Sequence, residues 1–179
     1  MRCDPVRKRF GFVILLAAVA ACDAGADDPL AEMQLSGPDI AQGQPIPVIH
    51  TCDGQNQSPA LRWSGPPART KSLALVMDDP DAGSDPYHHW GIYDLPASAR
   101  SIAAGASPGK QAMNDGREMG YTGPCPPKGD APHHYHFKLY ALDVAELQVP
   151  AAARIDTVEA EAKRHAVGKA ELTATYQRE

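Results

Sequence analysis

Three polar clusters in the sequence carry residue types that bind small anions or move protons. They are the acidic segment 78–83, the histidine pair His88 and His89, and the segment 123–136 with three histidines and a tyrosine. Imidazole N–H and phenol O–H groups donate hydrogen bonds to anions, and a carboxylate can orient a histidine. Each cluster alone also has an ordinary structural explanation, such as an Asp-Pro turn or a rigid proline-rich loop.

Strand alternation predicts that two of these clusters meet. A strand over 72–77 and its continuation place Asp79 on the same face as three apolar residues, and a strand over 133–142 does the same for His133 and Tyr135. Both apolar faces therefore change to polar side chains at one end. Donors and a carboxylate above an apolar floor are typical of a small-ligand site.

The remaining pattern predicts a mostly β domain. Short strands are expected around Met33 and Leu35 and over 46–51, 61–63, 90–95 and 172–176, with long loops over 97–132. Residues 157–167 have helix-forming residues with acidic side chains early and basic ones late, and Gly168 is expected to end that helix. A hydrophobic content of 43% and a charged content of 22% are ordinary for one globular domain.

The N-terminus predicts export. Residues 1–21 combine basic residues with an uncharged apolar run, as in a signal peptide. Small residues lead directly into Cys22, as in the bacterial lipoprotein signal, so we expect lipidation of Cys22, a tether over 22–31 and a domain over 32–179. The alternative is an ordinary signal peptide, with Cys22 an incidental thiol. The expected location is the periplasmic side of a membrane, through the lipid anchor.

The net charge limits the classes of partner, and the cysteine content bears on disulfide formation. Residues 1–21 carry four basic and one acidic side chain, so the rest of the chain has 13 basic and 21 acidic ones, a formal charge of −8. Such a surface repels nucleic acid, which we do not expect as a partner. In an oxidising compartment Cys52 and Cys125 form either a disulfide or two buried, inert thiols.

The order of motifs resembles the phosphatidylethanolamine-binding protein family, in particular its bacterial Raf kinase inhibitor-like branch. The motifs are Asp-Pro-Asp-Ala from Asp79, His-Trp from His89, Gly-Pro-Cys-Pro-Pro-Lys-Gly from Gly123, and His-x-Tyr from His133. The likeness covers about residues 33 to 176. It implies two antiparallel sheets of Greek-key topology, long loops, one C-terminal helix and a small pocket for phosphate-like or carboxylate-like anions.

The resemblance also implies the ligand-binding residues. They are Asp79, Asp81, His89, Gly123, Pro124, His133 and Tyr135. Two positions depart from the family pattern, because Gly83 stands where many members have proline and His134 where many have arginine. The first leaves the loop less rigid, and the second removes any contact which that arginine makes.

The expected function is non-catalytic binding of a phospholipid headgroup, such as phosphoethanolamine, or of another phosphorylated ligand, without a cofactor. Family members include lipid binders, kinase regulators and protease inhibitors, so an inhibitory or regulatory protein partner stays open. We further expect Asp79 to support both His89 and His133.

Two other functions compete with this expectation. One is a periplasmic metal-binding protein that uses the histidines, aspartates and Cys52. The other is a hydrolase with Asp79 and His89 as acid and base, for which no nucleophile is apparent.

Overall fold

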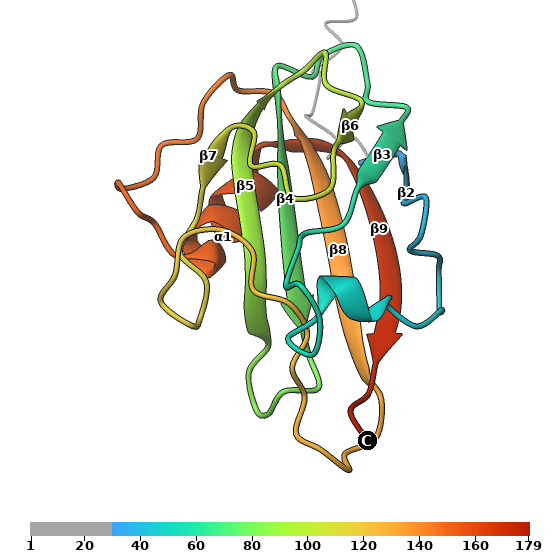
Figure 1. The fold of residues 1–179 in the computed structure, drawn as a ribbon. Coiled ribbons are helices and arrows are strands. Elements are labelled where there is room, and N and C mark those ends of the chain that lie inside the picture. Colours follow the sequence, from blue (N-terminus) through green and yellow to red (C-terminus); the bar gives the residue numbers. More distant parts are fainter. Residues whose placement is uncertain (1–29) are drawn as a thin grey trace, which may run out of the picture.

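The computed structural model describes residues 30–179 and contains two β-sheets (Figure 1). The larger sheet has the strand order β1-β9-β8-β4-β5-β7. Its strands are β1 (Ala31–Glu32), β4 (Ser72–Asp79), β5 (Tyr87–Pro96), β7 (Lys110–Gln111), β8 (His133–Leu142) and β9 (Ala166–Tyr176). The smaller sheet has the order β2-β3-β6, formed by β2 (Gln34–Ser36), β3 (Leu61–Ser64) and β6 (Ser101–Ile102). A short 3-10 helix, η1 (Val48–His50), and the helix α1 (Ile155–His165) complete the elements.

The pairing confirms a mostly β domain with two sheets and one α-helix among the described residues. Strand β4 pairs antiparallel with β5 and β8, and β8 pairs antiparallel with β9 over almost its whole length. One pair departs from the antiparallel expectation, because β1 runs parallel to β9. The Greek-key path stays a prediction.

Both faces of the large sheet are buried. Side chains of β4 at alternate positions, Leu73, Leu75 and Met77, pack toward the small sheet. The intervening Ala74 and Val76 pack beneath α1. All eight residues of β4 are buried as a result, so this strand is a rigid support for the aspartate at its end.

Two local predictions were wrong. Residues 46–51 were expected as a strand, but 48–50 form η1. Pro47 has no N–H for a sheet ladder, and its carbonyl accepts from the N–H of His50 in the tight turn. Gly168 does not end α1, because β9 begins at Ala166. A Cβ on Gly168 would lie 3.0 Å from Pro67 and 3.1 Å from the Ala31 carbonyl oxygen, so close packing favours glycine there.

The chain enters the domain at the opposite end of the large sheet from the polar residues. Ala31, expected to end the tether, pairs with Gly168 near the start of β9, whereas His133 pairs with Tyr176 at its end. The expected signal peptide and Cys22 lie outside the described residues. Among residues 30–179, no helix is both long and apolar enough to cross a bilayer.

Candidate functional site

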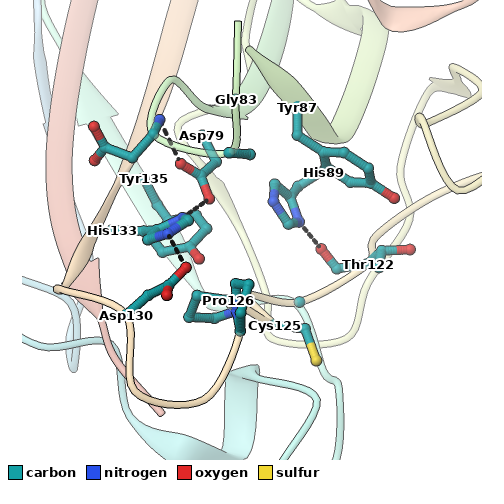
Figure 2. A pocket seen from close by; sticks show the side chains of 14 residues that line it. Asp79, Gly83, Tyr87, His89, Thr122, Cys125, Pro126, Asp130, His133 and Tyr135 are labelled. Carbon is teal, nitrogen blue, oxygen red and sulfur yellow. Dashed lines mark hydrogen bonds and ion pairs between the residues drawn. The ribbon is translucent and has the colours of Figure 1, made fainter. Parts of the chain in front are cut away.

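Two stretches that are distant in sequence, 79–89 and 122–135, enclose a cavity of about 380 Å³ at one end of the large sheet, and each contributes two segments. These segments are the end of β4 with its loop, the start of β5, the loop before β8, and the start of β8 (Figure 2). The lining residues are Asp79, Asp81, Ala82, Gly83, Tyr87, His89, Thr122, Gly123, Cys125, Pro126, Pro127, Asp130, His133 and Tyr135. The prediction that the polar ends of β4 and β8 meet is confirmed.

A buried carboxylate–imidazole pair forms one wall. Nδ1 of His133 lies 2.8 Å from Oδ2 of Asp79, and the backbone N–H of Asp81 donates to Oδ1 of Asp79 at 2.8 Å. Asp79 is 2% exposed and His133 is 7% exposed. The other ring nitrogen of His133 lies 3.9 Å from a carboxylate oxygen of Asp130, which is half exposed at the cavity rim. Both nitrogens of this ring therefore face negative charge.

His89 stands across the cavity from His133 (Figure 2). Its Nδ1 donates to the backbone carbonyl of Thr122 at 2.8 Å. Burial lowers the pKa of His89, and the opposing effects of the Thr122 carbonyl and of nearby Asp79 do not cancel this shift. The expectation that Asp79 supports both histidines therefore holds only for His133, because a backbone carbonyl holds His89.

Tyr135 supplies a hydroxyl without a protein partner. The residue is 0% exposed, and its hydroxyl makes no hydrogen bond to any of residues 30–179. Its ring meets the His89 ring edge to face, with centroids 5.3 Å apart. Burial raises the pKa of Tyr135, and the Asp79 carboxylate, which lies near the phenol without making a well-formed hydrogen bond to it, reinforces the shift, so the phenol keeps its proton. A buried donor without a partner favours a ligand or a water molecule in the cavity.

The carboxylate of Asp81 is held by His134. Oδ2 accepts hydrogen bonds from the backbone N–H of His134 at 2.8 Å and from its ring Nδ1 at 2.7 Å. These two bonds lower the pKa of Asp81. The His134 position, where this chain departs from the family pattern, thus fixes Asp81.

Gly123 and Pro124 differ in their position relative to the wall. Gly123 lines the cavity and donates its N–H to Oδ1 of Asn56 at 2.6 Å. A Cβ there would collide with the His50 carbonyl and the Asn56 side chain, so only glycine fits. Pro124 is buried behind the wall, where its carbonyl accepts from the N–H of Cys52 at 3.1 Å. Of the seven predicted ligand-binding residues, all except Pro124 line the cavity.

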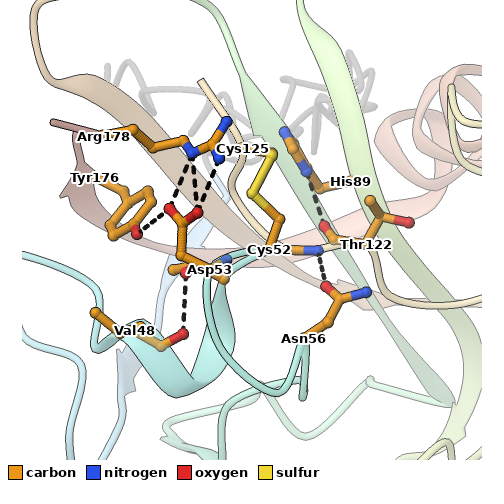
Figure 3. The surroundings of a disulfide bond; sticks show 11 residues. Val48, Cys52, Asp53, Asn56, His89, Thr122, Cys125, Tyr176 and Arg178 are labelled. Carbon is orange, nitrogen blue, oxygen red and sulfur yellow. Dashed lines mark hydrogen bonds and ion pairs between the residues drawn. A yellow bond between two sulfur atoms is a disulfide. The ribbon is translucent and has the colours of Figure 1, made fainter. Parts of the chain in front are cut away.

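A disulfide joins Cys52 to Cys125, with the two Cα atoms 5.4 Å apart (Figure 3). Both cysteines are exposed, and Cys125 forms part of the cavity wall. Next to it, Asp53 accepts from the guanidinium of Arg178 and from the hydroxyl of Tyr176. The hydrogen bonds from Arg178 and Tyr176 lower the pKa of Asp53. The disulfide therefore ties the loop before β8 to the segment after η1, and the Asp53 cluster ties that segment to the end of β9.

The wall also contains residues that the sequence interpretation did not select. Tyr87 precedes His89 by two residues, so strand alternation could have found it. Pro126, Pro127 and Asp130 belong to a loop whose path has no periodic signal. Thr122 acts through its backbone carbonyl, for which the residue type gives no signal.

The competing chemistries find little support within residues 30–179. No group of three or more His, Cys, Asp or Glu side chains in that range is arranged to hold a metal ion, and Cys52 is in the disulfide. The sequence does contain the hydrolase spacing Gly-x-Ser-x-Gly, at Gly105–Gly109. Ser107 lies between β6 and β7, far in sequence from any strand-to-helix turn, and lines a separate hollow that has no histidine.

Comparisons with known proteins agree with this architecture. Residues 36–177 match the family described as phosphatidylethanolamine-binding protein. The chain is 37% identical to a UPF0098 protein of Aquifex aeolicus over 153 residues, which cover 82% of this chain and 90% of that protein. It is 42% identical over 158 residues to LppC of Mycobacterium tuberculosis, a lipoprotein by name. These residues cover 87% of this chain and 78% of LppC.

Solved structures give the same result. The crystal structure of E. coli YbcL, described as a new member of the mammalian PEBP family, has a TM-score of 0.78 and 33% identity, and covers 83% of this chain and 100% of that one. A Chlamydia trachomatis protein, described as a phosphatidylethanolamine-binding protein homologue, has a TM-score of 0.76 and 36% identity. The match covers 83% of this chain and 99% of that one. This chain belongs to the phosphatidylethanolamine-binding protein family.

Proposed function

We propose that this protein is a non-catalytic binding protein whose cavity takes a small phosphate-like anion, either free or as part of a phosphorylated ligand such as phosphoethanolamine. The observation that carries the proposal is the buried hydroxyl of Tyr135, which has no hydrogen-bond partner among the described residues and belongs to a side chain that lines the cavity together with His89 and His133. A tetrahedral anion offers oxygens to that hydroxyl and to the imidazoles.

The cavity dimensions and lining favour a headgroup-sized ligand. A volume of about 380 Å³ is at the small end of ligand pockets. Ala82, Pro126 and Pro127 give an apolar rim, while Asp130 adds a half-exposed carboxylate that suits an ammonium group. A phosphate with an attached ethanolamine therefore fits the charges better than a larger polyanion.

We propose further that the protein is exported and lipid-anchored through Cys22, with the residues between Cys22 and β1 as a tether, because Ala31 already belongs to β1. The signal-like residues 1–21, a lipoprotein-named relative and a disulfide between exposed cysteines support this location. Labelling cells with a fatty-acid analogue tests it, with Cys22→Ser as the variant. Loss of label and membrane fraction in that variant is expected, and unchanged labelling would exclude the anchor.

The direction of the cavity favours a ligand that is not part of the anchoring membrane. The cavity lies at the His133 end of β9, about 25 Å from the Ala31 end, at 3.3 Å per residue. With the entry end of the domain toward the bilayer, the cavity points away from the bilayer. A soluble phosphorylated ligand then reaches the cavity more easily than a headgroup of that bilayer.

An NMR titration tests the proposal and distinguishes the two sources. Inorganic phosphate, phosphoethanolamine and vesicles containing phosphatidylethanolamine are added separately, and the side-chain signals of His89, His133 and His165 are followed. We expect saturable shifts of His89 and His133 with the soluble ligands, while His165, on α1, serves as the control. Shifts with vesicles alone would assign the ligand to a lipid headgroup, and no saturable shift with any of the three would refute the binding role.

A further inference from the structure

The hydrogen-bond directions in the cavity leave His89 with an acceptor facing the ligand. A carbonyl oxygen cannot donate, so the 2.8 Å contact with Thr122 fixes the proton of His89 on Nδ1. In the neutral ring, Nε2 then carries a lone pair. That atom has no hydrogen-bond partner among residues 30–179, and the ring lines the cavity. A fully deprotonated anion would place oxygen lone pairs against this nitrogen.

The surroundings do not supply compensating positive charge. No lysine or arginine is among the cavity-lining residues, and Lys128, in the loop before β8, donates to the backbone carbonyl of Glu179 instead. His133 is held between Asp79 and Asp130. The wall therefore offers an anion one neutral imidazole and a second imidazole flanked by carboxylates.

Carboxylates, a carbonyl and two aromatic rings surround His89. Asp79, Asp78 and Asp115 favour the imidazolium, and Thr122 adds its carbonyl, while Tyr87 and Tyr135 contribute rings at 4.8 and 5.3 Å. His89 is only 5% exposed, and burial outweighs these charges, so the pKa of His89 is lowered. At neutral pH the ring is an acceptor.

We propose that the cavity selects anions that bring their own proton, such as the monoanion of a phosphate monoester, and rejects fully ionised tetrahedral anions such as sulfate at neutral pH. This inference rests on the proposed function. The ligand O–H donates to Nε2 of His89, while its other oxygens accept from Tyr135. Whether the proton sits on oxygen or nitrogen, the complex holds one proton more than neutral His89 and the fully deprotonated anion.

The proposal predicts two different pH profiles. Methyl phosphate has a second pKa of about 6, so its affinity falls about tenfold per pH unit above that value and levels off below it. Sulfate has no proton near neutral pH and needs the imidazolium of His89, so its affinity keeps rising as the pH falls from 7 toward 5. Methyl phosphate should bind at least about tenfold more tightly than sulfate at pH 7, and the ratio should shrink toward one at pH 5.

Isothermal titration calorimetry of the purified protein with methyl phosphate and with sodium sulfate, from pH 5 to 8, tests this selectivity. Buffers with different ionisation enthalpies count the protons taken up. Equal affinities for the two anions at pH 7, or a sulfate affinity independent of pH, would overturn the selectivity and leave the binding function standing. Absence of binding for both anions at every pH would overturn both proposals.

A variant and a spectroscopic signal give independent readouts. In His89→Gln a side-chain amide can donate a hydrogen bond near the position of Nε2 without titrating. The affinity for sulfate should therefore rise relative to the affinity for methyl phosphate at pH 7. The matched control is His165→Gln on α1, which should leave the ratio of the two affinities unchanged.

In the unchanged protein, the ¹⁵N shift of His89 Nε2 should report an unprotonated nitrogen in the free protein at pH 7 and a hydrogen-bonded nitrogen when methyl phosphate is bound. A protonated Nε2 in the free protein at pH 7 would refute the selectivity even if the variant fails to fold.

Discussion

Asp79 and His133 lie 54 residues apart in the chain, yet their side chains are joined by a 2.8 Å contact in which His133 Nδ1 donates to the carboxylate. They come from the neighbouring strands β4 and β8, at the polar end of each. The pair fixes the ring so that its other nitrogen lies toward the rim at Asp130. The orientation of one imidazole is thereby set by the register of the central sheet.

Asp79→Asn tests this orientation. The amide keeps an acceptor for His133 but removes the charge that strengthens the bond, since charge-assisted hydrogen bonds are about twice as strong as neutral ones. We expect affinity for methyl phosphate at pH 6.5 to fall about three- to tenfold, measured by calorimetry. Asp85→Asn, an exposed residue of the same loop, is the matched control. Unchanged affinity and an unchanged pH profile would show that Asp79 does not orient the site.

Tyr135→Phe separates binding from stability. The change removes a buried hydroxyl that has no protein partner, so the free energy of unfolding should stay the same or rise by up to about 1 kcal/mol. Anion affinity should fall about tenfold, because the ligand loses a donor. Tyr93→Phe makes the same change in β5 on the face covered by α1 and should leave affinity unaltered. A loss of stability without a loss of affinity would contradict the role given to the hydroxyl.

Removing the disulfide should affect both the fold and the cavity. Cys52 and Cys125 are 73 residues apart, and a crosslink over such a loop stabilises by about 2–4 kcal/mol. The double variant Cys52→Ala/Cys125→Ala, or the reduced protein, should lose about that much free energy of unfolding in a urea titration. Because Cys125 forms part of the wall, anion affinity should also decrease. Unchanged affinity in a variant shown to be folded would mean that the wall keeps its shape without the crosslink.

The burial of His89 predicts how ligand stabilisation depends on pH. The pKa of His89 is lower in the folded protein than its unfolded value of about 6.5, so its contribution to stability is complete above that pH and is lost as the pH falls through the folded value. An anion that binds the protonated ring offsets this loss. At a ligand concentration tenfold above Kd the gain is about 1.4 kcal/mol.

Thermal unfolding with and without sulfate measures this effect. The rise in Tm caused by a fixed sulfate concentration should be larger at pH 5.5 than at pH 7.5. A rise that is equal at both values, or larger at pH 7.5, would contradict a neutral, buried His89.

The parts of the site that follow strand periodicity could be predicted from the sequence. Asp79, His133 and Tyr135 each lie an even number of residues from apolar side chains of their own strand. Strand alternation therefore predicts that all three side chains lie on the same face of the sheet. The family resemblance added His89 and Gly123. Strand alternation also predicts that Tyr87 lies on the same face of β5 as His89.

Other features depend on contacts that no local pattern encodes. The proton position of His89 is set by the Thr122 carbonyl, and any residue type could provide that group. Cysteine spacing left the Cys52–Cys125 bond open, because only the fold brings η1 and the loop before β8 together. Residues 46–51 have the apolar content of a strand, but Pro47 favours the turn that became η1.

The decisive experiment is a crystal structure of the protein soaked with methyl phosphate at pH 6. We expect a tetrahedral ligand in the cavity, with oxygens about 3 Å from His89 Nε2 and from the Tyr135 hydroxyl. A saturated crystal with the ligand bound elsewhere, or with only water between these two residues, would contradict it.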